Sequence, residues 1–220
     1  MAGMRSLTNE ELELLLARLG VRAGGRDRVL VLLGAHTGFR VSELLALTIG
    51  HVADGSAVRR EVVLERRRMK GGAGVYRKSV GSRRVVLTPT ARAAIGDYLI
   101  RRFGGPAWDA ELPLFPSRKG SGALGRTEAW RILSQAAQSC GLSGRIGTHS
   151  LRKTLAARVY ENTGHDLVLT QKVLGHRHVT TTAQYLDTTQ DAADAAVLAA
   201  DGGGGPGATR ELGRALSWRP

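Results

Sequence analysis

Hydrophobic residues recur at helical spacing near the start of the chain. Leucines follow Thr8 at positions 12, 15, 16 and 19, and Thr8 with Glu11 has the sequence pattern of a capping box. The apolar run within residues 26–36 predicts a buried helix that breaks at the Thr37–Gly38 turn. Another helix is predicted from Ser42 to Leu47, with Ser42 as its N-cap.

The pattern then changes to the alternation that is typical of strands. Two such segments are "VRREVVLERRRM" (58–69) and "RRVVLT" (83–88), and the glycine-rich "KGGAG" (70–74) between them indicates a turn region. A third, short strand is expected at His51–Asp54. The sequence therefore predicts a small three-stranded antiparallel sheet.

Helical spacing resumes at Pro89 with "PTARAAIGDYLIRRF". A loop rich in glycine and proline covers 104–125, and a helix near Thr127–Cys140 follows, with Thr127 as its expected cap. Two or three further helices are predicted over 149–200. The expected fold class is mainly α with a small three-stranded antiparallel β-sheet, that is, α+β.

A chain of 220 residues has room for one sizeable domain with short appendages. Residues 1–187 are expected to form that domain and 188–201 an appended C-terminal helix. The glycine-rich "DGGGGPG" predicts a flexible linker, so that 202–220 is a linker with a basic tail.

The charge balance indicates a polyanionic partner. Basic residues outnumber acidic ones 32 to 19, which gives a net charge of +13. Such a field attracts nucleic acid, although a merely solvated arginine-rich surface is the alternative. Cys140 is the only cysteine, which excludes a cysteine-based zinc site and fits a reducing, cytoplasmic setting. No apolar run reaches the roughly eighteen residues of a membrane span, and the glutamates at 10, 11 and 13 argue against a secretory signal.

Two polar motifs carry residues suited to attack on a phosphodiester. "GAHTGFRVSELLALT" contains Arg40, and "GTHSLRKTLAARVYENTGHDLVLTQKVLGHRHVTTTAQYLDTT" contains His149, Arg152, His176 and Tyr185. Cleavage without metal needs a nucleophile, proton transfer and neutralisation of charge on the phosphoryl oxygens. Arginine forks grip phosphate oxygens, and histidine transfers protons near neutral pH. His149 lies three residues before Arg152, so at a helix start both would face the same way.

Several of these residues have plainer interpretations. Glu43 could be a helix-start carboxylate that interacts only with the helix dipole. His176 and His178 could suggest a metal site, but no acidic or cysteine ligand stands nearby at suitable spacing. Tyr160 is a competing nucleophile, but its mid-helix position is more typical of a core residue. Tyr76 and Tyr98 have no motif around them.

The segments "TGFRVSELLALT", "THSLRKT" and "VLGHRHVTTTAQYLD" resemble the catalytic domain of tyrosine recombinases, the phage integrase family, over about residues 6–187. The resemblance implies that Arg40 and Arg152 bind and activate the scissile phosphate. It implies that His149 assists proton transfer, that His176 hydrogen-bonds the phosphate, and that no cofactor or metal is needed. Tyr185 would attack the phosphate to give a 3′-phosphotyrosine and a free 5′-hydroxyl.

The same resemblance implies supporting residues. Glu43 would brace the site, and a lysine in the turn between two strands would protonate the leaving oxygen. Lys70 is the expected lysine, and Lys78 is the rival because the turn is long. Contacts with the phosphates of the DNA duplex are expected from Arg118, Lys119, Arg126 and Arg131. A solvated face is the alternative for these four.

One departure from the family concerns length. Most members carry a separate helical domain before the catalytic one, whereas Arg40 here follows only thirty-nine residues. The chain is thus either a fragment or a small integrase without the usual N-terminal DNA-binding domains, and the capped first helix favours the second interpretation. "QDAADAAVLAAD" (190–201) is either exchanged between subunits or packed on its own body.

The resulting hypothesis is a site-specific DNA recombinase that integrates or excises phage or mobile-element DNA. Its expected partners are double-stranded DNA with core-type attachment sites, a homo-tetramer on that DNA, and host or phage accessory proteins. It would act in the bacterial cytoplasm, at the nucleoid. The alternatives are a type IB-like topoisomerase and a catalytically silent DNA-binding module.

Overall fold

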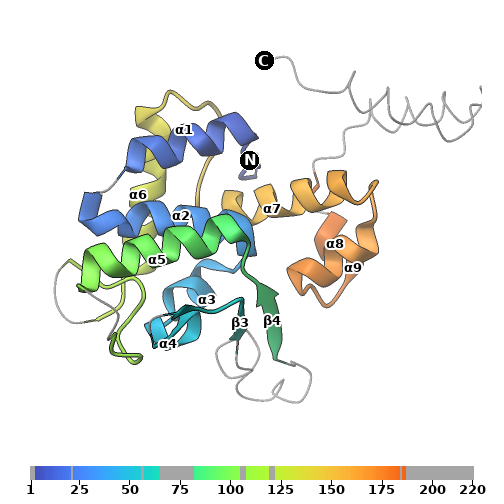
Figure 1. Ribbon diagram of the computed structural model, residues 1–220. Helices are drawn as coiled ribbons and strands as arrows, with labels where there is room; N and C mark the ends of the chain where they lie inside the picture. The colour runs from blue at the N-terminus through green and yellow to red at the C-terminus, as the bar shows by residue number, and fades with distance from the viewer. Residues whose placement is uncertain are drawn as a thin grey trace, which may run out of the picture. The chain divides into compact units, whose positions relative to one another are not determined.

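The computed structural model describes residues 3–20, 22–55, 57–64, 82–104, 108–118, 122–183 and 185–186. The chain divides into two units, Met1–Tyr185 and Leu186–Pro220. Helices make up most of the first unit (Figure 1). The helix expected at 188–201 and the tail at 202–220 lie outside the described residues.

Helix α1 (Asn9–Leu19) forms as its apolar spacing predicts. Thr8 is the N-cap: its hydroxyl accepts from the Glu11 amide, and the Glu11 carboxylate accepts from the Thr8 amide. The four leucines of the pattern are buried. The predicted capping box and the predicted core face are both confirmed.

Helix α2 (Arg26–Thr37) follows the short 3-10 helix η1 (Arg22–Gly25) and is the central element of the core. It is buried along nearly its whole length and packs against α1, α5 and α7. Figure 1 shows α2 between these helices. It ends at Gly38, whose φ of 60° is left-handed backbone that glycine adopts without strain. This end of α2 leads directly into the residues of the candidate site.

The small sheet differs from the expected three strands. Strand β3 (Glu61–Leu64) pairs antiparallel with β4 (Arg83–Val86), and β1 (Ala53–Asp54) pairs with β2 (Ala57–Val58), so the described strands form two two-stranded sheets. The expected third strand starts two residues late because His51 belongs to helix α4 (Ile49–Val52). The His51 ring accepts from the Thr48 amide at 3.0 Å, a local cap that starts a helix.

Two helices begin earlier than predicted. Helix α3 (Val41–Leu45) is capped at Arg40, whose amide donates to Glu43 at 2.8 Å, so Ser42 lies inside the helix and is not its cap. Helix α6 (Arg126–Ser139) is capped at Gly125 without a side-chain bond, so Thr127 is not a cap either.

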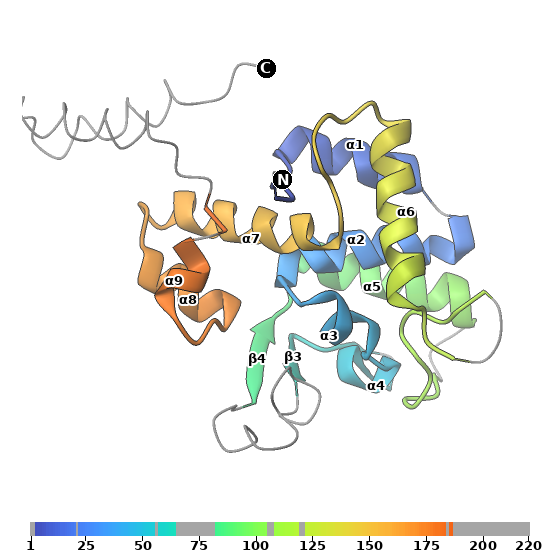
Figure 2. The ribbon, with the colours of Figure 1, turned by 180° about the vertical axis from the view of Figure 1, so that it is seen from behind.

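The remaining helices are α5 (Pro89–Phe103), α7 (Thr148–Asn162), α8 (Leu167–Leu174) and α9 (Val179–Ala183). Figures 1 and 2 show from opposite sides that α8 and α9 lie at one end of α7. Helix α8 thus brings the chain back to the C-terminal end of α2. None of the described helices combines the length and apolar character needed to cross a membrane.

We predict that Thr8→Ala lowers the free energy of unfolding by about 1 kcal/mol, because the Glu11 amide at the start of α1 loses its acceptor. Chemical denaturation measures this directly. Thr127→Ala is the matched control, because Thr127 is exposed and caps nothing. An equal loss in both variants would contradict the assigned caps.

Candidate active site

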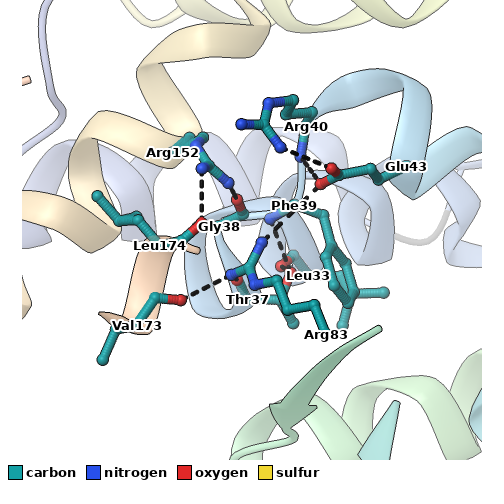
Figure 3. Close-up of polar contacts among 10 residues, drawn as sticks. All are labelled: Leu33, Thr37, Gly38, Phe39, Arg40, Glu43, Arg83, Arg152, Val173 and Leu174. Carbon is teal, nitrogen blue, oxygen red and sulfur yellow. Dashed lines mark hydrogen bonds and ion pairs between the residues drawn. The ribbon is translucent and has the colours of Figure 1, made fainter. Parts of the chain in front are cut away.

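Arg152 of α7 is a buried arginine with 1% exposure. One terminal nitrogen donates to the Gly38 carbonyl and the other to the Leu174 carbonyl, the latter at 2.7 Å (Figure 3). Gly38 ends α2 and Leu174 ends α8, so one guanidinium joins two segments far apart in sequence. Burial lowers the pKa of Arg152, and the nearby charge of Arg40 lowers it further.

Arg40 and Glu43 form an ion pair beside Arg152. The Arg40 guanidinium donates to Glu43 at 2.8 Å, and Glu43 is 1% exposed whereas the Arg40 side chain is 28% exposed. Figure 3 shows both residues at the start of α3. Arg40 therefore keeps a solvent-accessible side while Glu43 fixes its position from within.

His176 follows the left-handed turn at Gly175 that ends α8. Its side chain is buried, and Nδ1 shares a hydrogen bond of 2.9 Å with the Thr182 hydroxyl in α9. Burial, together with the charges of Arg152, Arg40 and Arg83, lowers the pKa of His176 to about 4. The ring is therefore neutral at physiological pH, and its Nε2 has no hydrogen-bond partner among the described residues.

Tyr185 lies beside His176 and Arg152. Its ring centroid is 4.9 Å from that of His176 and 6.0 Å from the guanidinium carbon of Arg152. Its amide donates to the Thr182 carbonyl at 2.9 Å, which ties the tyrosine to α9. Arg40, Arg152, His176 and Tyr185, expected to act together, therefore lie in one region of the described structure.

His149 takes a different position. It is exposed in the first turn of α7, one turn before the buried Arg152, and makes no hydrogen bond to the other candidates in the described part of the chain. The two residues share a helix, as expected, but differ in exposure. Lys70, Lys78 and Lys119 lie outside the described residues, as does Tyr76.

The other tyrosines that could compete with Tyr185 are placed elsewhere. Tyr98 is buried, and its hydroxyl donates to the Leu114 carbonyl at 2.7 Å. Tyr160 is half-buried in α7 with its ring 4.9 Å from that of His165.

The arginines expected at a DNA-binding face are exposed but partly paired. Arg118 donates to the buried Asp27 at 3.0 Å, and Arg131 forms an ion pair of 2.8 Å with Glu128. Arg126 is exposed at the start of α6.

Arg83 is a site residue that the sequence patterns did not single out. It begins β4, is 8% exposed, and donates to the Thr37 carbonyl at 3.2 Å and the Val173 carbonyl at 2.7 Å. Burial and the charge of Arg152 lower the pKa of Arg83 to about 10. Strand alternation was the available signal, since it puts Arg83 on the same face as the buried Leu87.

Residues 5–191 match the model of the Phage integrase family, and the chain belongs to this family. Tyrosine recombinase XerD of Corynebacterium glutamicum is 32% identical over 166 residues, covering 76% of this chain and 49% of that protein. XerD of Mycobacterium leprae is 34% identical over 192 residues, covering 82% and 56%. The chain thus spans about half the length of these curated relatives.

Solved structures agree on the fold. XerA recombinase superposes with a TM-score of 0.67 at 24% identity, over 88% of this chain and 63% of that one. XerH site-specific recombinase, in a pre-cleavage complex with its difH substrate, has a TM-score of 0.62 at 26% identity, over 87% and 53%.

We predict that His176 makes stability depend on pH below neutrality. Its pKa of about 4 in the folded chain lies below the ordinary value of 6.5, so the unfolded chain binds the proton more readily. Stability should fall as pH drops from about 6.5 toward 4, by on the order of 1 kcal/mol per pH unit. Urea unfolding at several pH values measures the slope.

The variant to compare is His176→Gln. Its free energy of unfolding should depend less steeply on pH between about 6.5 and 4 than that of the wild type. His178→Gln, at an exposed histidine, should keep the wild-type slope. If His176→Gln retains the full slope, the neutral buried histidine is the wrong description.

Proposed function

We propose that the chain is the catalytic part of a site-specific DNA recombinase of the integrase type, with residues 1–187 as the catalytic domain. The observation that carries the proposal is the grouping of Tyr185 with Arg152 and His176, at ring distances of 6.0 and 4.9 Å. A phenol beside a buried guanidinium and a neutral imidazole suits attack on phosphorus. The recombinase relatives support the same reaction.

In the proposed reaction the Tyr185 oxygen attacks the scissile phosphorus and the 5′ oxygen leaves. The bond between phosphorus and tyrosine stores the energy of the broken phosphodiester, so that a new 5′-hydroxyl reverses the step. Arg40 and Arg152 bind the non-bridging oxygens, where negative charge grows. Arg152 uses two of its five N–H groups on Gly38 and Leu174, which leaves donors for the phosphate.

The two histidines have different proposed tasks. His176 is neutral, so it can donate one hydrogen bond to a phosphate oxygen without adding charge. His149, exposed at the start of α7, assists transfer of the tyrosine proton when DNA covers this end of the helix. Glu43 braces Arg40 through their 2.8 Å ion pair.

The proposed partner is double-stranded DNA carrying core-type attachment sites from a phage or mobile element. Arg118, Lys119, Arg126 and Arg131 contact its backbone, so binding weakens steeply with salt. Four subunits act together on two sites, with 188–201 as the helix that links neighbours, and accessory proteins assist. The reaction takes place in the bacterial cytoplasm, at the nucleoid.

We predict that the protein forms a covalent adduct with a nicked attachment-site substrate whose released strand diffuses away. Tyr185→Phe should abolish this adduct, because phenylalanine has no nucleophilic oxygen. Tyr160→Phe is the matched control and should keep it. Denaturing gel electrophoresis detects the adduct, and mass spectrometry locates the modified residue.

An adduct that persists in Tyr185→Phe would contradict the assignment of the nucleophile. Strand exchange that requires a defined pair of sites distinguishes a recombinase from an enzyme that relaxes any supercoiled plasmid.

We also predict that Lys70→Ala slows cleavage about 10²- to 10⁴-fold, because the leaving oxygen loses its proton donor. A substrate with sulfur in place of the 5′ oxygen needs no proton, so it should restore the rate in this variant alone. Lys78→Ala should cleave both substrates at close to the wild-type rate. If the sulfur substrate restored the rate of Lys78→Ala and not that of Lys70→Ala, Lys78 would be the general acid.

A further inference from the structure

Arg83 and Arg152 contact neighbouring carbonyls on the same two segments. Arg83 donates to Thr37 and Val173, while Arg152 donates to the next residues, Gly38 and Leu174. Figure 3 shows the two guanidiniums one above the other between the end of α2 and the end of α8. We call these contacts the double arginine bridge. The two guanidiniums thus hold the segment that leads to Arg40 against the segment that leads to His176, Arg83 through one terminal nitrogen and Arg152 through both.

The stem of Arg83 also shapes the turn before His176. A Cβ added at Gly175 would lie 2.9 Å from the Arg83 Cδ, and Gly175 has a left-handed φ of 64°. On its other side the Arg83 guanidinium carbon lies 5.7 Å from the centre of the Phe39 ring. Arg83 therefore occupies the space between the "TGF" and "LGH" segments, and glycine is required where the chain passes it.

Arg83 is linked to Arg40 through Glu43. One terminal nitrogen of Arg83 lies 3.9 Å from the Glu43 carboxylate, whose other oxygen accepts from Arg40 at 2.8 Å. Glu43 is buried, and among the described residues removal of Arg83 would leave the Arg40 guanidinium as the one ion-pair partner of its carboxylate. Any rotation of that carboxylate would move the Arg40 fork with it.

We propose that Arg83 is a positioning residue for DNA cleavage, which holds the Arg40 and His176 sides of the site at a fixed separation. The proposal rests on the proposed function, since it assigns Arg83 a part in that reaction. Arg83 acts through Glu43, Gly175 and the two carbonyls, and not by taking part in bond making. A reactive group misplaced by about 1 Å can slow the chemical step on the order of 10²-fold, and supporting residues hold such groups in place.

The test compares Arg83→Met and Arg83→Lys with Arg84→Met. Arg84 is the next residue on β4, its side chain is 66% exposed, and it pairs with Glu61 at the surface. Single-turnover adduct formation at saturating DNA gives the rate of cleavage, and fluorescence anisotropy gives the affinity for DNA. Circular dichroism checks that each variant is folded.

We expect Arg83→Met to slow cleavage about 10- to 100-fold while DNA affinity changes little. Arg83→Lys should recover part of the rate, because it restores the charge but not the planar fork. Arg84→Met should cleave like wild type. The loss in the double variant Arg83→Met with Glu43→Gln should be smaller than the product of the single losses, because both act on Arg40.

A folded Arg83→Met that cleaves at the wild-type rate overturns the proposal, as does an equal loss in Arg84→Met. If Arg83→Met does not fold, Arg83→Lys decides: a full wild-type rate overturns the positioning role, and a slower rate at unchanged affinity supports it.

Absence of any adduct in wild type would instead contradict the proposed function. Amide hydrogen exchange then tests Arg83 without a reaction. Faster exchange at 39–43 and 175–177 in Arg83→Met, but not in Arg84→Met, supports the double arginine bridge, and unchanged exchange overturns it.

Discussion

The N–H groups of a buried guanidinium need hydrogen-bond acceptors, and the Arg152 guanidinium finds them in two separate segments of the chain. Its terminal nitrogens donate to the carbonyls of Gly38 and Leu174, which lie at the ends of α2 and α8, where carbonyls have no partner within the helix. The two motifs that carry Arg40 and His176 therefore meet at one residue. Without these two contacts the charge of Arg152, which is 1% exposed, would stay buried and uncompensated.

The charge of the site is unbalanced in favour of an anion. Arg40 and Arg83 lie beside the buried carboxylate of Glu43, and the charge of Arg152 is close enough to interact with it. His176 is neutral because burial, and then the charges of the same three arginines, lower its pKa to about 4. In the proposed reaction, a phosphate that enters the site would relieve the mutual repulsion among the arginines, most of all when negative charge grows on its oxygens. Under that proposal the site favours the charge distribution of the transition state.

The helical part of the fold and most of the catalytic candidates could be predicted from sequence. Leucine spacing defined α1, and the motifs around Arg40, Arg152, His176 and Tyr185 selected residues that lie together. The predicted caps at Ser42 and Thr127 were wrong because Arg40 and Gly125 occupy the cap positions, each two residues earlier. Arg83 was missed because its contacts are tertiary: both its carbonyl partners belong to segments far away in sequence.

We infer that the groups around Arg152 bind one phosphate. A crystal structure of the chain with an uncleaved attachment-site duplex would test this binding. We expect the scissile phosphate within hydrogen-bond distance of Arg40, Arg152 and His176, with the Tyr185 oxygen opposite the 5′ oxygen. A scissile phosphate held by other residues, or Tyr185 directed away from phosphorus in every subunit, would contradict this arrangement.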